Sequence, residues 1–268
     1  MTTEQSTMGG LPEVAEISIG APFQWLKEGW ADFRQIPTQA LTYGVILATI
    51  SAGLTNALLF SGYSSWIMVL AGGFLFVAPM FAMGIYEAGR RLERGEKPTL
   101  GEMLVVKPSS TLDLAYLGLA LLMIYFFWTR IAQVIYGLST YQVHRTIWDF
   151  LHFAAFDPEG HNMVLTGTIF GGLMAFLVFC LVVVSAPMLL ERHTNVFSAT
   201  ITSFRTVAKN PGAMAVWAVL IVGLTVIGIL TAFIGLVVIF PWIGLASWRA
   251  YRGLVDSPDH PGFTPKPL

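Results

Sequence analysis

The sequence predicts an all-α membrane protein with six transmembrane helices, arranged as three pseudo-repeated hairpins. Hydrophobic residues make up 55% of the chain and charged residues 12%, whereas a soluble domain carries about 25% charged residues. Apolar stretches of about 20 residues, enough for a helix to cross a bilayer, recur along the chain. Three times a basic stretch that closes on a proline (Pro37, Pro108, Pro211) precedes a pair of apolar stretches. Each hairpin is therefore expected to follow an amphipathic helix that lies in the cytoplasmic interface.

The six spans are expected at residues 41–60, 66–86, 112–130, 163–190, 213–232 and 234–250. The last two share a stretch without charges between Lys209 and Arg249, which as a single helix would be roughly 58 Å long, about two membrane thicknesses. A tight turn near residues 231–235 is therefore expected to divide it. The membrane domain would cover residues 18–255, between a disordered tail at 1–17, which is polar, small and acidic, and a second tail at 256–268.

The basic residues predict the orientation of the chain. With six spans, every Lys and Arg except Arg130 and Arg145 lies on the same side of the membrane. By the positive-inside rule this side is the cytoplasm, so both termini are expected there and the location is the inner membrane. The first ~40 residues show no secretory signal, so the first span is expected to direct insertion.

Three amphipathic segments are expected beside the spans. Phe23, Leu26, Trp30 and Phe33 recur at helical spacing after Ala21. Residues 99–102 (TLGE) have the spacing of a capping box. A third helix is expected over about 195–208, with Phe197, Ile201, Phe204 and Val207 on one face.

These segments suggest a basic collar that binds anionic lipid headgroups, worth about 1 kcal/mol for each well-placed Lys or Arg. The alternative is that they only determine topology and anchor the hairpins. The expected headgroup contacts are Lys27, Arg34, Arg90, Arg91, Arg94, Lys107, Arg205, Lys209, Arg249 and Arg252.

Prolines within the second span of each hairpin are expected to kink those helices, because each removes one backbone hydrogen bond. They are Pro79, Pro187 and Pro241, and such kinks either let hairpins pack or act as hinges of a transporter. Arg130 ends the third span and is expected to reach the outer headgroups as an interface anchor. Its alternative is a pair with Asp113 or Glu87, although both are expected at the cytoplasmic end.

Few residues suggest chemistry. His144, Asp149, His152, Asp157 and His161 cluster in the outer segment 131–160, where a metal site is conceivable, but their spacing favours solvated interface residues. The expected spans contain no histidine, which argues against a bis-histidine haem. No phosphate-binding glycine loop, nucleophile elbow or acid pair is found. No catalytic residue, metal or other cofactor is therefore predicted.

Several motifs resemble a family of bacterial predicted integral membrane proteins of unknown function. They are residues 128–132 (WTRIA), 185–190 (SAPMLL), 209–211 (KNP) and 241–252 (PWIGLASWRAYR), and the likeness covers about residues 20–255. More distantly, the three-hairpin pattern is similar to the membrane domain fused to some glycerophosphodiester phosphodiesterases, which implies a lipid-facing module. The family has no established catalytic residues, so none is transferred.

The predicted function is that of a non-catalytic structural, assembly or lipid-associated membrane factor. Its expected partners are membrane lipids, with a homo-oligomer or a membrane complex as further partners and no nucleic acid. Two alternatives are a transporter or channel for a small amphiphile and an accessory subunit of a respiratory complex. A lipid-acting enzyme would have to use Glu87, Arg90 and Arg91.

Overall fold

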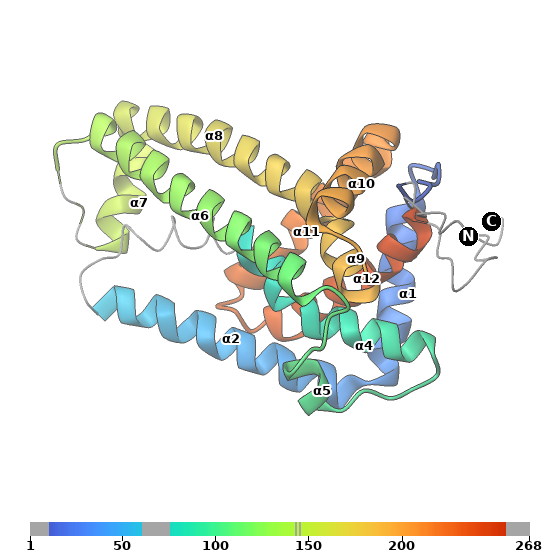
Figure 1. The fold of residues 1–268 in the computed structure, drawn as a ribbon. Coiled ribbons are helices and arrows are strands. Elements are labelled where there is room, and N and C mark those ends of the chain that lie inside the picture. Colours follow the sequence, from blue (N-terminus) through green and yellow to red (C-terminus); the bar gives the residue numbers. More distant parts are fainter. Residues whose placement is uncertain (1–10, 61–75, 143, 145, 256–268) are drawn as a thin grey trace, which may run out of the picture.

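A computed structural model describes residues 11–60, 76–142, 144 and 146–255, and these residues form an all-α structure (Figure 1). The all-α part of the predicted fold class is confirmed. The helices are α1 (Ala21–Gln35), α2 (Pro37–Phe60), α4 (Met83–Glu93), α5 (Leu100–Leu104), α6 (Thr111–Ser139), α7 (Ile147–Phe156), α8 (Pro158–Val182), α9 (Ser185–Glu191), α10 (Val196–Lys209), α11 (Pro211–Leu230) and α12 (Leu236–Leu254).

Within the residues that the structure describes, four helical segments are long and apolar enough to cross a membrane. They are Pro37–Phe60, Thr111–Ser139, Pro158–Glu191 and Pro211–Leu230, and they match the first, third, fourth and fifth expected spans. The expected span 66–86 falls partly outside the described residues, and its described part is helical from Phe76 with a turn at Ala82. The expected span 234–250 corresponds to α12, which is not among the four candidates.

Helix α12 is an internal helix in its second half. It packs against α1, α2, α4, α9 and α11, and Leu245, Trp248 and Tyr251 are fully buried. A Cβ atom on Gly44 of α2 would overlap the backbone carbonyl of Val237, so α2 approaches α12 this closely only because of the glycine. The second half of α12 is therefore a buried helix at the centre of a group formed with α1, α2, α4, α9 and α11, and it does not face lipid.

The turn between α11 and α12 occupies residues 231–235, where the charge-free stretch was expected to divide. Ala232 and Phe233 have φ values of 52° and 68°, in the left-handed region. The hydroxyl of Thr231 accepts a hydrogen bond from the backbone N–H of Gly235, at 2.9 Å. These local contacts close the predicted hairpin.

Helices α6 and α8 lie side by side, and α7 packs beside them at the end remote from α1 and α10 (Figure 1). Helix α6 continues beyond the third expected span into the outer segment 131–160 and ends at Ser139. Thr146 and Asp149 then form a capping box at the start of α7. Helix α8 begins at Pro158, earlier than the expected span at 163, because proline suits a first helical turn.

The three prolines differ in their effect on the backbone. Helices α8 and α9 are separated at Val183 and Val184, and Pro187 cannot donate to the carbonyl of Val183 four residues earlier. The hydroxyl of Ser203 on α10 accepts from the free N–H of Val184, at 3.2 Å. Pro79 instead lies in the helical segment 76–81, and α12 continues through Pro241.

The two ends of the described chain lie together. Val14 and Val255 form an antiparallel β-bridge, and the N–H of Ala15 donates to the carbonyl of Leu254, at 2.9 Å. The N–H of Ile17 also donates to the Oδ1 of Asn210, at 2.9 Å. Residues 11–17 therefore hold a defined position, unlike the predicted disordered tail, whereas 1–10 and 256–268 lie outside the described residues. The described chain ends on the side where it begins.

Candidate lipid-headgroup interface

Arg249, an expected headgroup contact, is paired inside the protein. Its Nε and Nη2 donate to Asp32 Oδ2 and Oδ1 at 2.6 and 2.7 Å. Asp32 is 2% exposed, so this ion pair joins α1 to α12 beneath the surface. Both donor groups that face Asp32 are therefore used within the fold.

Arg252 is also held internally and is only 6% exposed. Its Nε and Nη1 donate to Glu93 and Glu191, at 2.9 and 3.0 Å. The hydroxyl of Tyr251 donates to Glu191 and accepts from Arg192 Nε. Burial, and then the carboxylate of Glu191, raise the pKa of Tyr251, so its hydroxyl stays protonated. This network ties α4, α9 and α12 together, and the expectation that Arg252 meets headgroups does not fit its burial.

Glu87, Arg90 and Arg91 form a third ion-paired cluster, in which Glu87 is buried and both arginines are partly exposed. Arg90 contacts Glu87 at 2.7 Å, Arg91 contacts it at 2.8 Å, and Arg91 reaches Glu102 of α5 at 2.9 Å. The hydrogen bond that Arg91 donates to Glu87 is the chief cause that raises the pKa of Arg91. Glu102 completes the predicted capping box with Thr99, whose backbone N–H lowers the pKa of Glu102. Both oxygens of Glu87 are engaged within α4, and the contact of Arg91 with Glu102 joins α4 to α5.

Six expected headgroup contacts have exposed positions. They are Lys27, Arg34, Arg94, Lys107, Arg205 and Lys209. Arg205 and Lys209 stand one turn apart on α10. The collar is therefore divided between a buried or partly buried set, whose arginines pair with carboxylates, and an exposed outward set.

Helix α10 turns its polar face into the protein and its apolar face outward. Thr202 and Thr206 are fully buried, with their hydroxyls bonded to the carbonyls of Ser198 and Thr202, at 2.7 and 2.9 Å. The outward residues Phe197, Ile201 and Phe204 are 77%, 49% and 39% exposed. The predicted apolar face is thus present, except that Val207 is buried. With 3.6 residues per turn, Arg205 and Lys209 follow one border of the outward apolar face.

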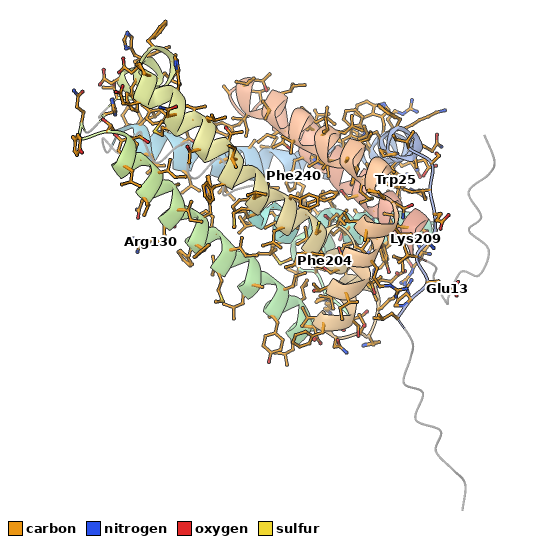
Figure 2. The ribbon with its side chains drawn as sticks, turned by 90° about the horizontal axis from the view of Figure 1, so that it is seen from above. Glu13, Trp25, Arg130, Phe204, Lys209 and Phe240 are labelled. Carbon is orange, nitrogen blue, oxygen red and sulfur yellow. The ribbon has the colours of Figure 1, made fainter. Side chains whose placement is uncertain are left out.

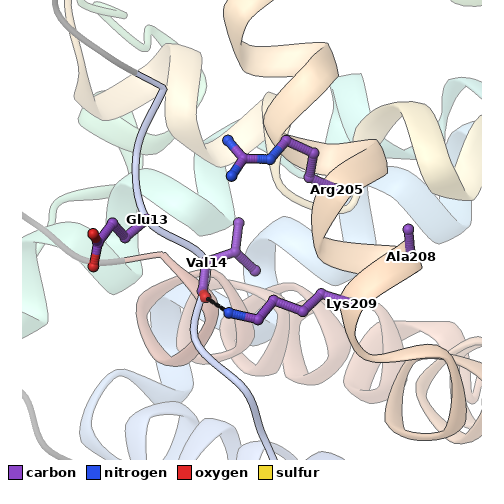
Figure 3. Close-up of a pocket in the computed structure, with 5 residues that line it drawn as sticks. All are labelled: Glu13, Val14, Arg205, Ala208 and Lys209. Carbon is purple, nitrogen blue, oxygen red and sulfur yellow. Dashed lines mark hydrogen bonds between the residues drawn. The ribbon is translucent and has the colours of Figure 1, made fainter.

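Beside this border lies an open pocket of about 540 Å³, lined by Glu13, Val14, Arg205, Ala208 and Lys209 (Figure 3). The ammonium of Lys209 donates to the carbonyl of Val14, at 2.8 Å. It also lies 3.7 Å from Glu16. The pocket thus has charges of both signs and adjoins the outward face of α10.

Helix α1 is a second amphipathic helix at the same end of the molecule. Trp25, Leu26 and Phe33 are buried, whereas Phe23 and Trp30 face outward. The predicted apolar stripe is therefore shared between the core and the surface. Lys27 and Arg34 are exposed on the same helix.

Arg130 lies at a distance from this end, as Figure 2 shows for its position relative to Lys209 and Glu13. It is exposed on α6, and its Nη1 donates to Gln133 Oε1, at 3.0 Å. Asp113 instead accepts from the backbone N–H of Val196, at 2.8 Å. Because Glu87 is held by Arg90 and Arg91, neither acid expected as an alternative partner pairs with Arg130.

His144 is a buried anchor in the remote segment. Its Nδ1 lies 2.8 Å from the hydroxyl of Tyr136, and its ring stacks on Phe153 at a centroid distance of 4.6 Å. The Nε2 of His161 lies 2.8 Å from the carbonyl of Ala155. Among the described residues, no three His, Cys, Asp or Glu side chains group as a metal site. The sequence reasoning missed this aromatic packing, for which Tyr136 and Phe153 were the available signal.

Large exposed hydrophobic side chains define the class of the protein. Leu54 of α2, Phe127 of α6, Phe176 of α8 and Val219 of α11 are all exposed, on four helices long enough to cross a bilayer. Such surfaces are typical of helices that meet lipid. The protein is thus a helical integral membrane protein, for which several crossings are plausible.

Residues 67–191 match a family model described as predicted integral membrane protein (DUF2189), a family of unknown function. The match runs from the expected second span to the end of α9 and includes Arg130 and Pro187. No curated protein and no solved structure gave a match. The more distant resemblance to the membrane domain of glycerophosphodiester phosphodiesterases therefore receives no support.

Proposed function

We propose that the protein is a non-catalytic, lipid-associated structural or assembly factor of the bacterial inner membrane. The observation that carries this proposal is the outward apolar face of α10, bordered by Arg205 and Lys209. A helix with an apolar face and basic flanking residues lies in the membrane interface, with its apolar side chains below the headgroups.

The polar side of α10 supports this placement. Its buried hydroxyls already have hydrogen-bond partners within the protein, including the contact of Ser203 with Val184. The apolar side is therefore the one available to the bilayer. Helix α1, with Phe23 and Trp30 outward, would lie in the same interface.

We infer a six-span topology of three hairpins, with both termini in the cytoplasm. The bridge between Val14 and Val255 supports an even number of crossings. Helices α1, α5 and α10 each precede a candidate span, and α1 and α10 lead directly into Pro37 and Pro211. The positive-inside rule then assigns this end to the cytoplasm. In this arrangement Arg130 would be near the outer headgroups.

The charged clusters support a structural role. The carboxylates of Asp32, Glu87 and Glu191 are engaged by arginines, which leaves them poorly suited to act as a general acid or base. Around Pro187 the buried neighbours Ala186, Met188 and Leu189 are hydrophobic. This packing supports a sealed helix junction and disfavours a polar passage for an amphiphile at that proline.

Native mass spectrometry of the protein released from membranes in mild detergent tests the proposal. Bound phospholipid is expected, and the double variant Ile201→Asn and Phe204→Asn should retain less of it, because both side chains leave the apolar face. Val105→Asn is the matched control, since Val105 is exposed outside the helices. Lipid retention unchanged by the double variant would contradict the role of α10. Co-purification of an oxidase in place of lipid would favour the respiratory alternative.

A further inference from the structure

The pocket beside α10 contains two opposite charges that do not pair with one another. Glu13 and Arg205 both line it, and both are exposed. Within the described chain neither side chain forms an ion pair or a hydrogen bond. Figure 3 shows Arg205 extending from α10 towards the amino-terminal segment that carries Glu13. A bound molecule with charges of both signs could contact each of them.

The cationic side of the pocket is suited to a phosphate. The guanidinium of Arg205 presents a fork of N–H donors that matches phosphate oxygens. Lys209 uses one donor for the Val14 carbonyl, and an ammonium has three. Glu13 would oppose a purely anionic ligand but would attract a primary ammonium on the same headgroup.

The apolar side of the pocket indicates that the ligand has acyl chains. Ala208 lines the pocket and is exposed on the same face of α10 as Phe204 and Ile201. A headgroup in the pocket would therefore place its glycerol and chains along this outward face. A free phosphodiester would leave the face uncovered.

We propose that this pocket binds the headgroup of an amine-bearing phospholipid, with Arg205 and Lys209 on the phosphate and Glu13 on the ammonium. The proposal rests on the proposed function, because it requires α10 to lie at the membrane interface. It adds a headgroup preference that the basic collar alone would not produce, since a purely basic surface favours anionic lipids.

Native mass spectrometry of the full-length protein, delipidated in detergent, tests the preference. The protein is titrated with phosphatidylethanolamine, phosphatidylcholine and phosphatidylglycerol of identical acyl chains. Phosphatidylethanolamine is expected to bind about tenfold more tightly than the other two, the effect of one charge-assisted hydrogen bond. Soluble glycerophosphoethanolamine at equal concentration should not displace it. Equally effective displacement would identify a free phosphodiester as the ligand and overturn the lipid assignment.

Two variants separate the charges of the pocket. Glu13→Gln should remove the preference for phosphatidylethanolamine over phosphatidylglycerol. Arg205→Gln should lower the affinity for all three lipids by about tenfold. Lys97→Gln is the control and should change neither the preference nor the affinity, because Lys97 is exposed but lies outside the pocket and is not among the expected headgroup contacts. Circular dichroism and gel filtration confirm that each variant folds, as expected because neither Glu13 nor Arg205 has a partner in the described chain.

The outcomes distinguish this site from the proposed function. Lipid binding that does not depend on the headgroup would overturn the assignment of the pocket as a headgroup site, while the lipid-associated role stands. A preference for phosphatidylethanolamine that is unchanged in Glu13→Gln would do the same. Tighter binding of phosphatidylglycerol by the wild-type protein would also overturn it. Absence of any phospholipid binding would overturn both proposals.

Discussion

Asp32 and Arg249 form a bidentate ion pair across 217 residues of sequence, with N–O distances of 2.6 and 2.7 Å. The pair fixes α1, which carries outward aromatic residues, to the buried helix α12. Because Asp32 is almost fully buried, removal of Arg249 would leave its side chain in the interior without this ion pair. The position of the amphipathic helix is thus coupled to an internal charge.

Removal of one partner of this pair should destabilise the protein. Arg249→Leu is expected to lower the free energy of unfolding by about 3 kcal/mol, because it leaves Asp32 buried and unpaired. The double variant Asp32→Leu and Arg249→Leu should recover most of the loss. Denaturation in detergent measures both, with the exposed Arg94→Leu as a control expected to change little. Equal losses in the single and double variants would contradict the pairing.

Two glycines of α2 should respond differently to the same substitution. Gly44→Ala places a methyl group against the Val237 carbonyl and is expected to cost about 2 kcal/mol of stability. Gly53→Ala meets no atom within 4 Å and should be neutral or stabilising by about 0.5–1 kcal/mol, from helix propensity. Thermal unfolding of the two variants in one detergent makes the comparison. Similar changes in unfolding temperature for the two variants would mean that α2 does not approach α12 closely at Gly44.

The capping box at α5 should be sensitive to acid. The hydrogen bonds of Thr99 lower the pKa of Glu102 below its ordinary value of 4.5. Its contribution to stability is therefore fully present above about pH 4.5 and is lost as pH falls through the lower pKa of the folded state. The protection of the Met103 and Leu104 amides against hydrogen exchange, relative to the intrinsic rate at each pH, should fall over that range. In the Glu102→Gln variant the same amides should be less protected at neutral pH, and their protection should depend little on pH. An unchanged response to acid in this variant would contradict the role of Glu102 in the cap.

Local signals predicted several elements correctly. The helical spacing after Ala21 indicated α1, the Thr99–Glu102 pattern indicated the cap of α5, and the charge-free stretch indicated the turn at 231–235. Each depends on residues close in sequence. The same reasoning could have found the cap of α7, because Thr146 and Asp149 have the capping-box spacing.

The direction in which several predicted surface residues point depends on long-range packing, which local sequence patterns do not show. Arg249 and Arg252 look like collar residues in the sequence, but Asp32 and Glu93, distant along the chain, bind them. The outward direction of Phe204 likewise depends on the burial of Thr202 and Thr206 against neighbouring helices. Helical spacing identifies a face but does not show whether protein or lipid covers it.

Cysteine accessibility in intact cells tests the topology most directly. In a Cys180→Ala background, single cysteines replace Ser18, Lys97 and Tyr141, which are all exposed. A membrane-impermeant maleimide should label Tyr141→Cys in intact cells, and Ser18→Cys and Lys97→Cys only after the inner membrane is permeabilised. Labelling of Ser18→Cys or Lys97→Cys in intact cells would contradict the account, because it would place the amino-terminal segment or the basic face outside the cytoplasm.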